Sequence, residues 1–518
     1  MTISVPKTKT IERIEVVPEP SVVCKGAEAT DCKQALLSGP YDARKATHSN
    51  KLALGVIGIY ELVDPCRQWL INANEFVESE PTREIESDLS LERFKMLFPD
   101  YPGTDVAFEK HIAFDPTFEA RINTSELRRL NTANEFMYFE GLLELVESKL
   151  SYVISAGDKP PDVVLLLLSD AIYDAYHIIG DYHRKLKRPD PKKVNESALQ
   201  FDLFKDFDTI NLQPLPTEAA LLSRNLRSAI KKIAMNPKYG VPVQIIREST
   251  IRGGRGRQNL ATRTWNICTG LYYKTGNLPW VLDGLDPETC FLGLSFFHRK
   301  TAQTDFVFSS MAHLFSNDFN SVVLRGGRVR YDEKLKSAVL DRDKIADLVT
   351  RGLKAFEGNR GKPPKRLVIH KTSTYTQDEI AGVQDAVQHL NIAIDLVSIT
   401  KTPFRFIRWG KYPVPRGTTY VATDRDAFLY TKGFVPELQT YPGSHIPAPF
   451  HIQRAVGDSD ITRICSDILA LTKLNWNTAD FCCGVPITLG FARNVGDVFK
   501  EFGEDAPYEP SELFRFYM

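Results

Sequence analysis

This sequence lacks three things: net charge, long apolar runs and cysteines in CxxC spacing. The 65 basic and 65 acidic residues cancel, so the chain as a whole does not attract nucleic acid, and any such site must come from local clusters. The longest apolar run, 163–168, is too short to span a bilayer, and no N-terminal segment resembles a signal peptide. None of the eight cysteines has CxxC spacing, which argues against a zinc site. These absences predict a cytoplasmic protein with reduced thiols and no membrane contact.

The residues that are present predict an α/β protein with more than one domain. A chain of 518 residues is too long to fold around one ordinary hydrophobic core. An apolar share of 43% is typical of globular chains. Alternation of short strands with helices favours a largely parallel sheet. The predicted strands are 52–60, 162–168, 241–246, 290–294, 366–370 and 392–399. The predicted helices include 131–150, 224–234, 341–356, 377–390 and 466–474, and Asp64-Pro65 is typical of a further helix start. Residues 1–50 and 80–120 look irregular.

The stretch 258–300 organises the chain. Its first half has the apolar spacing of a helix, which Gly276 and Pro279 end. A short buried strand at 290–294 follows, with Ser295 after it. The boundary between two domains is expected near this point, giving a first domain at 1–285, which includes an N-terminal extension, and a second at 286–518.

Five motifs in order resemble the short prokaryotic Argonautes. The helix QN…WN…TGLYYKTGNLPW followed by FLGLSFFH is similar to the junction between their MID and PIWI domains. The others are Glu19-Pro20 with Gly39-Pro40, His183 with Lys187, the LNWN segment 474–477 and the PITL segment 486–489. The resemblance covers essentially the whole chain. It implies a Rossmann-like MID domain followed by an RNase H-like PIWI domain.

The resemblance also implies a pocket for the 5′-phosphate of a guide strand. His183 and Lys187 match the family's phosphate-gripping pair, Gln244 and Lys274 match its glutamine and second lysine, and Asn266 matches less securely. The residues alone allow plainer interpretations. The basic cluster around His183 is typical of a solvated helix end, Asn266 of a packing hydrogen bond, and Lys274 of a helix-capping cation. The C-terminal carboxylate of Met518 is expected to join the phosphate through a bound Mg²⁺, because two anions repel without a cation between them.

Further basic residues are candidates for contacts with a nucleic-acid backbone. They are Arg252, Arg255 and Arg257 in the RGGRGR segment, Arg325 and Arg328, and Arg405 and Arg408, which alternate with aromatic residues. RGGRGR lacks the Lys-Ser/Thr of a nucleotide P-loop. The residues alone equally allow a plain surface loop for the segments around Arg252 and Arg325. For the segment around Arg405 they allow an edge strand with alternating faces.

The positions expected to carry the metal ligands of an active PIWI domain hold other residues. Such a site needs acidic or His side chains around paired divalent metals. Here the places are occupied by Ser295, by Lys371 with Thr372, and by Arg493. A cation at position 371 is expected to repel metal. The sequence therefore predicts a PIWI domain that does not cut nucleic acid, and a chain that is not itself an enzyme.

The resemblance implies a role in defence together with a second subunit. The chain would hold a 5′-phosphorylated guide RNA, pair it with single-stranded target DNA, and activate an APAZ-containing effector subunit with a TIR, sirtuin-like NAD-consuming or nuclease domain. A higher oligomer on target binding is compatible with this role. The main alternative is a metal-dependent RNase H-like endonuclease, which would need carboxylates at positions 295, 371–372 and 493. An α/β metabolic enzyme is a third class, but no dinucleotide fingerprint follows the first strand.

Overall fold

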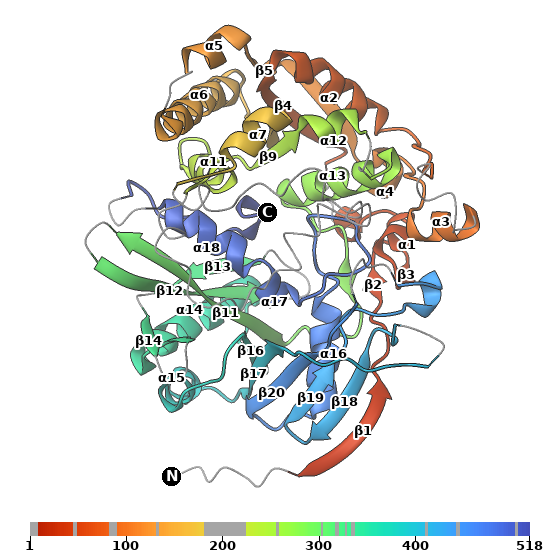
Figure 1. The fold of residues 1–518 in the computed structure, drawn as a ribbon, viewed down its shortest axis with the longest axis vertical. Coiled ribbons are helices and arrows are strands. Elements are labelled where there is room, and N and C mark those ends of the chain that lie inside the picture. Colours follow the sequence, from red (N-terminus) through yellow and green to blue (C-terminus); the bar gives the residue numbers. More distant parts are fainter. Residues whose placement is uncertain are drawn as a thin grey trace.

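The computed structural model places two β-sheets one above the other, with the C-terminus between them (Figure 1). It describes residues 9–44, 49–81, 91–130, 134–180, 224–254, 258–301, 304–315, 321–326, 329–332, 337–409, 413–441, 446–502 and 506–518. Among these, no helix is long and apolar enough to cross a membrane. All eight cysteines are unpaired thiols.

The smaller sheet has four parallel strands in the order β5-β4-β6-β9. Their bounds are β5 (His111–Ile122), β4 (Lys51–Ile59), β6 (Val163–Leu168) and β9 (Val243–Arg247). Every residue of β6 is buried, because side chains alternate between two covered faces. Leu165 packs toward α2 and Leu166 toward α6 and α11. The helices around this sheet are α2 (Tyr60–Asn72), α5 (Thr124–Arg129), α6 (Glu135–Ser155), α7 (Asp170–Tyr176), α11 (Leu226–Met235), α12 (Glu248–Arg252) and α13 (Leu260–Lys274).

The larger sheet has nine strands in the order β1-β18-β19-β20-β17-β16-β11-β12-β13. Only β11, β16 and β17 pair in parallel, which makes the sheet mixed. The bounds are β1 (Thr10–Val16), β11 (Thr289–Thr301), β12 (Thr304–Phe315), β13 (Val322–Arg325), β16 (Arg366–Lys371), β17 (Ala393–Lys401), β18 (Thr418–Thr423), β19 (Asp426–Leu429) and β20 (Phe450–Val456). Its helices are α14 (Arg342–Arg360), α15 (Gln377–Val387), α16 (Ile461–Leu471), α17 (Ile487–Gly490) and α18 (Ala492–Glu501).

Gly293 lets a helix approach the centre of the larger sheet. A Cβ at this position of β11 would lie 1.7 Å from the backbone oxygen of Thr488, so a side chain does not fit. His370 on β16 is the strand partner of Gly293. Its Nδ1 forms a 2.8 Å hydrogen bond with Oγ1 of Thr488. The α17 segment is thereby fixed directly against β11 and β16.

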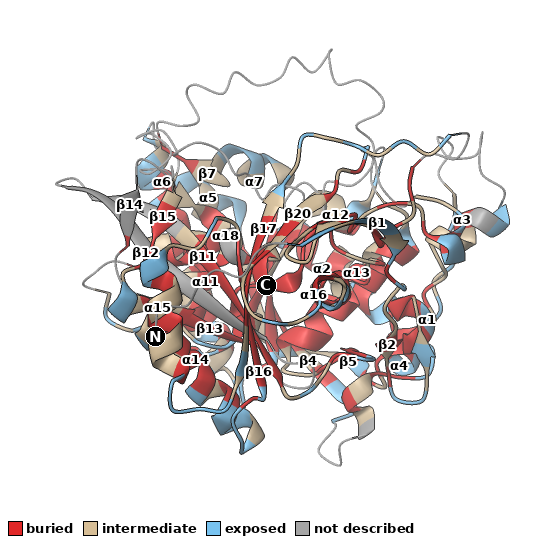
Figure 2. Cartoon of the chain, turned by 90° about the horizontal axis from the view of Figure 1, so that it is seen from below, coloured by how far each residue is buried: buried red, intermediate tan, exposed pale blue. Residues whose placement is uncertain are grey.

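Two of the resemblance motifs meet where the sheets join. The indole N–H of Trp280 donates to Lys473 O at 2.9 Å, and that of Trp476 donates to Trp280 O at 3.1 Å. Lys473 also pairs with Glu19 at 2.8 Å, as does Arg416. Burial alone would raise the pKa of Glu19, but the two cations lower it. The N-terminal segment is thus tied to the larger sheet, and the buried core runs through the junction (Figure 2).

Three sequence-based expectations differ from this fold. Thr10–Val16 lies in the range expected to be irregular and assigned to the first domain, yet it forms β1 on the edge of the larger sheet. Backbone pairing with β18 holds it, so no apolar run marks it in the sequence. His111–Ile122 forms edge strand β5 despite Pro116, because a register shift takes up the proline. Helix α2 begins at Tyr60, before Asp64-Pro65, and Leu62 and Val63 of its first turn are buried in the core. The boundary at 285/286 otherwise stays a prediction.

Short elements complete the chain. They are β2 (Val22–Val23), β3 (Glu28–Ala29) and β10 (Val281–Leu282), which form a three-stranded sheet, the pairs β7 (Ile178–Ile179) with β8 (Arg224–Asn225) and β14 (Arg330–Asp332) with β15 (Ser337–Val339), and the helices α1 (Cys32–Leu36), α3 (Leu91–Leu97), α4 (Thr104–Ala107), η1 (Tyr41–Arg44), η4 (Pro436–Leu438) and η5 (Phe514–Phe516).

Candidate nucleic-acid interface

Helix α13 carries a buried lysine to the space between the two sheets. The helix starts at the cap Asn259, whose side chain accepts from Thr262 N at 2.8 Å. Lys274 ends it and is fully buried. Burial, and then the charge of Arg227, lower the pKa of Lys274 to about 7. In this environment, a nearby anion would stabilise the charged form of Lys274.

The last residues of the sequence supply oxygens to this lysine and to a second one. The Nζ of Lys274 donates to the backbone oxygen of Met518 at 2.5 Å. On α11, the buried Lys231 donates to the backbone oxygen of Tyr517. Helices α11 and α13 both contact η5, so the chain end lies between them, as Figure 1 shows. Two buried ammonium groups therefore converge on one chain end.

Two polar atoms beside this chain end are buried without a hydrogen-bond partner. They are the hydroxyl of Tyr273 and Nε of Arg515. Burial lowers the pKa of Arg515 and raises that of Tyr273. Gly276 has φ +87°, and a Cβ there would lie 2.5 Å from Nη1 of Arg515, so the glycine makes room for the guanidinium. Unpaired donors in the same part of the structure as this chain end suit an anion with several oxygens.

The structure tests the placement of the predicted phosphate residues only in part. His183 and Lys187 lie outside the described residues. Gln244 is on β9, and its side-chain N–H donates to Ile245 O at 3.0 Å. Asn266 accepts from Ala479 N at 3.0 Å and donates to Gln258 Oε1 at 3.3 Å, so both of its polar atoms have partners in the protein. These contacts agree with the interpretation that Asn266 makes a packing hydrogen bond. A role for Asn266 at a phosphate stays a prediction.

The predicted backbone arginines that the structure describes do not form one cluster. Arg252 pairs with Glu248 at 3.0 Å at the end of α12. Arg325 ends β13 and lies 3.6 Å from Glu509. Arg405 donates to Phe404 O at 3.0 Å after β17, and the guanidinium of Arg408 lies 5.4 Å from the ring centre of Phe434. Strands β16, β11 and β12 separate β17 from β13. Arg255, Arg257 and Arg328 lie outside the described residues.

Two of the expected ligand positions, Ser295 and Thr372, are neighbours in the larger sheet. Leu294 on β11 pairs with Lys371, the last residue of β16, so Ser295 and Thr372 come directly after this pair. Ser295 lies inside β11, which runs past the predicted end at 294 to Thr301 and pairs there with β12. Arg493 lies on α18, which packs against β11; its side chain lies outside what the structure describes. Within the described residues, no group of three or more His, Cys, Asp and Glu side chains is placed to hold a metal ion.

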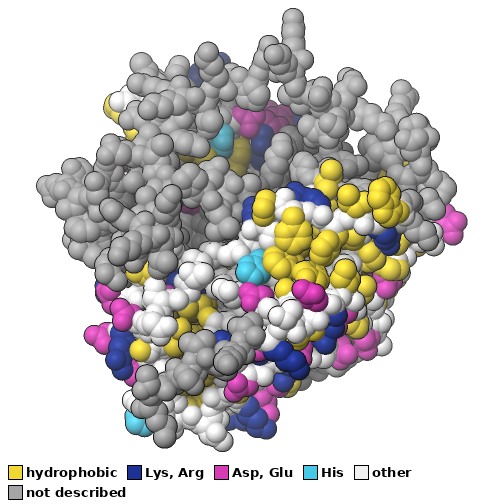
Figure 3. Space-filling model, turned by 60° about the horizontal axis from the view of Figure 1, so that its bottom comes forward, with side chains coloured by type: hydrophobic (Ala, Val, Ile, Leu, Met, Phe, Trp, Pro, Cys, Tyr) yellow, Lys and Arg dark blue, Asp and Glu magenta, His cyan; other side chains and the backbone are white. Residues whose placement is uncertain are grey.

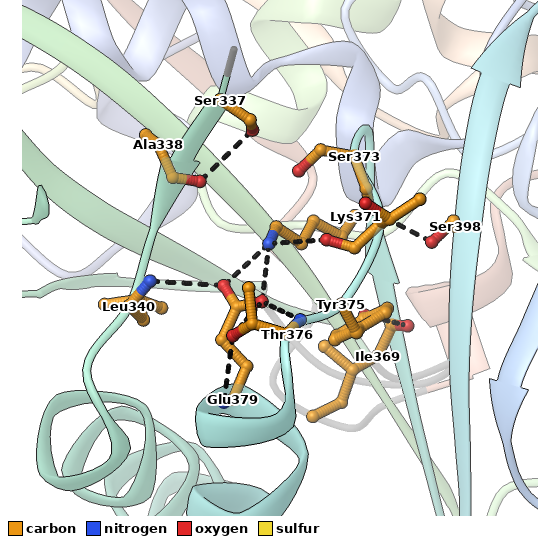
Figure 4. A network of polar contacts seen from close by, with 11 residues as sticks. Ser337, Ala338, Leu340, Ile369, Lys371, Ser373, Tyr375, Thr376, Glu379 and Ser398 are labelled. Atoms are coloured by element: carbon orange, nitrogen blue, oxygen red, sulfur yellow. Dashed lines mark hydrogen bonds and ion pairs between the residues drawn. The ribbon is translucent and has the colours of Figure 1, made fainter. Parts of the chain in front are cut away.

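Lys371 is a buried cation with a carboxylate partner. Its Nζ lies 2.6 and 2.8 Å from the two carboxylate oxygens of Glu379, and both side chains are fully buried (Figure 4). Burial lowers the pKa of Lys371, while the ion pair opposes this shift. Glu379 also accepts from Thr376 N at 2.9 Å at the start of α15. The charge of Lys371 is therefore paired inside the protein, and repulsion of a metal by it stays a prediction.

Sequence reasoning missed several residues of these sites. Lys231 lies in the basic amphipathic segment 224–234, but nothing in the segment indicates that its buried face meets the chain end. Arg515 is one basic residue in an apolar tail. Glu379 was detectable, because Thr376 and Glu379 have the spacing of a helix capping box.

Known proteins are similar to this chain in sequence and in fold. No known family profile matches the sequence. The protein argonaute of Aquifex aeolicus is 25% identical over 245 residues, which is 46% of this chain and 31% of that protein.

Solved structures extend the similarity to nearly the whole chain. Clostridium butyricum Argonaute, bound to a guide DNA and a 19-mer target DNA, matches with a TM-score of 0.61 at 13% identity, covering 95% of this chain and 53% of that one. The crystal structure of A. aeolicus Argonaute matches with a TM-score of 0.57 at 14% identity, covering 97% and 55%. The chain thus spans about half the length of these solved structures, and they confirm the predicted α/β fold of a MID unit followed by a PIWI unit.

Proposed function

This chain is an Argonaute homologue by sequence and has an Argonaute fold, and from this premise we propose that it is the guide-binding subunit of a short Argonaute defence system. It holds a short 5′-phosphorylated guide RNA and pairs it with single-stranded target DNA. Base pairing selects the target, while the protein grips the backbone and the guide's end.

The observation that carries this proposal is the buried pair Lys274 and Lys231 at the chain end. Both ammonium groups reach backbone oxygens of the last two residues, and Arg515 and Tyr273 add unpartnered donors nearby. A terminal phosphate carries negative charge and several acceptor oxygens, which are the complement of this cluster of positive charges and donors. Its closeness to Met518 agrees with the expected position of the guide's 5′ end.

We propose that the chain binds target without cutting it. Support comes from Ser295 within β11 and Thr372 directly after β16, neighbouring positions at which an active site needs carboxylates. The buried Lys371–Glu379 pair adds to this, because Glu379 is committed to an ammonium and to the cap of α15. The competing function, a metal-dependent RNase H-like endonuclease, requires ligands that these positions do not supply.

The signal of target binding passes, in this proposal, to an APAZ-containing effector subunit in the cytoplasm. That subunit carries a TIR, sirtuin-like or nuclease domain, and its activity ends the infection of the cell. A higher oligomer forms when target binds. The reduced thiols of the chain are consistent with this compartment.

Mg²⁺ at the guide end is a further part of the proposal. The oxygen of Met518 is a ligand of the type that Mg²⁺ prefers, and the ion would neutralise the repulsion between that chain end and a phosphate. The side chain that donates to this oxygen, Lys274, is a cation, so phosphate oxygens would have to complete the site. Lys274 already places one positive charge at Met518 without any metal.

The direct test is to purify the chain and sequence the nucleic acid that accompanies it. Short RNAs with 5′-phosphates are expected. Binding of synthetic guides then measures the preference for a 5′-phosphate over a 5′-hydroxyl. Equal affinity for the two guides would contradict the proposed phosphate site.

A further inference from the structure

The outer edge of the smaller sheet contains a cavity of about 330 Å³ between β5 and α2, at the top of Figure 1. Val56 of β4 and Ile112 of β5 are buried in its wall, and Ile71 of α2 beside them is 42% exposed. The volume is near the lower end of the range for ligand pockets, about 300–1,000 Å³, so a compound with a single ring system fits. Figure 3 shows a different surface, on the side of the larger sheet, where hydrophobic side chains gather around a histidine.

The cavity lies at a bulge in β5. Leu54 pairs with Phe114 and the next pair is Val56 with Glu119, so β5 takes five residue steps where β4 takes two. Residues 115–118 leave the ladder. Bulges of this kind are common beside binding sites, because they re-aim side chains and interrupt regular packing.

Four charged side chains along this part of the sheet balance one another. Arg67, which lines the cavity, pairs with Asp64 at 3.2 Å and also with Glu119. Arg121 pairs with the same two carboxylates, at 2.8 and 2.7 Å. Two positive and two negative charges thus form a closed ring. Because the charge of Arg67 is matched within this ring, it does not favour an anion in the cavity.

The hydrogen bonds of His111 show that its ring adds no positive charge. Its Nε2 lies 3.3 Å from the amide nitrogen of Asn74, and that nitrogen also donates to Ile112 O at 3.1 Å. The oxygen of the same amide accepts from Ile112 N, which fixes the amide's orientation. Nε2 is therefore the acceptor, and Nδ1 carries the proton that Asp105 accepts at 3.2 Å. In this arrangement the ring is neutral and the carboxylate of Asp105 keeps its charge.

A second carboxylate, that of Asp115, lines the cavity directly. Hydrogen bonds from the hydroxyl and the backbone N–H of Thr117 lower the pKa of Asp115, so it is an anion. Among the described residues, neither Asp105 nor Asp115 pairs with a lysine or an arginine. The cavity thus combines an apolar wall with two negative charges that no cation of the described chain matches. A phosphate or a carboxylate is repelled by these charges, whereas an ammonium group is attracted.

We infer that this cavity binds a small organic cation in which a ring is joined by a short chain to an ammonium group. The ring packs against Val56 and Ile112, and the ammonium group donates to the carboxylate of Asp115. Strand β5 lies at the other edge of the sheet from β9, and the cavity includes neither Lys231 nor Lys274. The inference is therefore independent of the proposed function.

The test compares three probes that share one ring and chain length: tryptamine, a cation; tryptophol, which is neutral; and indole-3-propionate, an anion. Each is titrated into the whole chain, and its dissociation constant is measured by ligand-observed NMR. Asp115→Asn removes the charge but keeps an oxygen that accepts from Thr117 N, and its control is Asp458→Asn, at an exposed carboxylate beside the larger sheet. Ile71→Lys places a cation at the cavity, and its control is Phe136→Lys, at a side chain 44% exposed on α6. Thermal unfolding of each variant checks that it folds.

Tryptamine is expected to bind most tightly and indole-3-propionate most weakly. Asp115→Asn should weaken tryptamine binding about two- to fivefold, the size expected for an exposed ion pair, and leave tryptophol binding nearly unchanged. Ile71→Lys should weaken the binding of both, and the two controls should bind every probe as the wild type does.

Equal affinity of the wild type for the three probes, or binding of none, would overturn the inference. Tightest binding of indole-3-propionate would overturn it too, by assigning the cavity to anions. A tryptamine affinity that neither cavity variant changes would place the bound cation elsewhere on the chain, and the inference would fail. Guide binding enters none of these measurements, so each of these results leaves the proposed function untouched.

Discussion

The Nζ of Lys274 lies 2.5 Å from the backbone oxygen of Met518, 244 positions further along the chain. The contact joins α13, which follows the strands of the smaller sheet in the chain, to the C-terminal residues, which follow the strands of the larger sheet. A buried cation is held at a chain end, and this arrangement leads to the first two predictions.

Lys274→Ala is expected to weaken the binding of a 5′-phosphorylated guide. Loss of one charge-assisted hydrogen bond costs about 1.5–3 kcal/mol, or about ten- to hundredfold in affinity. A guide with a 5′-hydroxyl should lose much less. Equilibrium binding of both guides is the measurement, with Lys238→Ala as control because Lys238 is exposed on the same unit. Equal losses of affinity for the two guides would mean that Lys274 contacts the guide's sugar-phosphate backbone and not its 5′-phosphate.

Guide affinity is expected to fall as pH rises above about 7. The pKa of Lys274 is lowered to about 7 in the unliganded protein, so its charged form is present below that pH and is lost above it. Only the charged form holds a phosphate strongly, and the affinity should fall by up to about tenfold per pH unit until the pKa of the complex is reached. Lys274→Arg keeps the charge and should flatten the profile. A wild-type profile that stays flat between about pH 6 and pH 9 would contradict this assignment.

Glu379→Gln is expected to destabilise the chain strongly. Lys371 and Glu379 are fully buried and paired at 2.6 Å, so removing the carboxylate leaves an ammonium without its counter-charge. Breaking such a pair costs about 3–5 kcal/mol, whereas replacing both members recovers most of the loss. Urea unfolding of Glu379→Gln, Lys371→Met and the double variant measures this. Asp385→Asn, at the exposed pair with Arg342, is the control and should change stability little. A double variant as unstable as the sum of the singles would contradict a paired role.

The chain is expected not to cleave target DNA with either Mg²⁺ or Mn²⁺. Ser295 within β11 and Thr372 directly after β16 are neighbours and offer no carboxylate. Guide-loaded protein is incubated with complementary target, and the products are resolved on a sequencing gel. Cleavage opposite the middle of the guide that a substitution in this chain abolishes would overturn the prediction.

Chelation of Mg²⁺ is expected to lower affinity for a phosphorylated guide more than for a hydroxylated one. The proposed ion is held between Met518 and phosphate oxygens, so a guide without the phosphate cannot complete its ligands. Binding measured in EDTA and again after Mg²⁺ is restored gives the comparison. An EDTA effect of equal size on both guides would assign the ion to the backbone and not to the guide end.

Sequence patterns were sufficient for the buried elements. The apolar run at 162–168 became β6, and the pattern at 377–390 became α15, because a strand buried on both faces and a capped helix are both encoded by neighbouring residues. The family motifs also placed Lys274 beside Met518. They did not reveal β1, which is mostly exposed and is held by hydrogen bonds to a strand that begins some 400 residues later.

What only the tertiary structure decided is the environment of each charge. In the sequence, Lys371 is a cation at a ligand position; in the fold it is neutralised by Glu379, which reaches it from the next helix. Lys231 is one of several basic residues on an amphipathic helix until packing brings it to Tyr517. Periodicity fixes which face of an element is buried, because that depends on local spacing. Which groups meet there depends on how distant elements pack, and the pKa values and the candidate site follow from that packing.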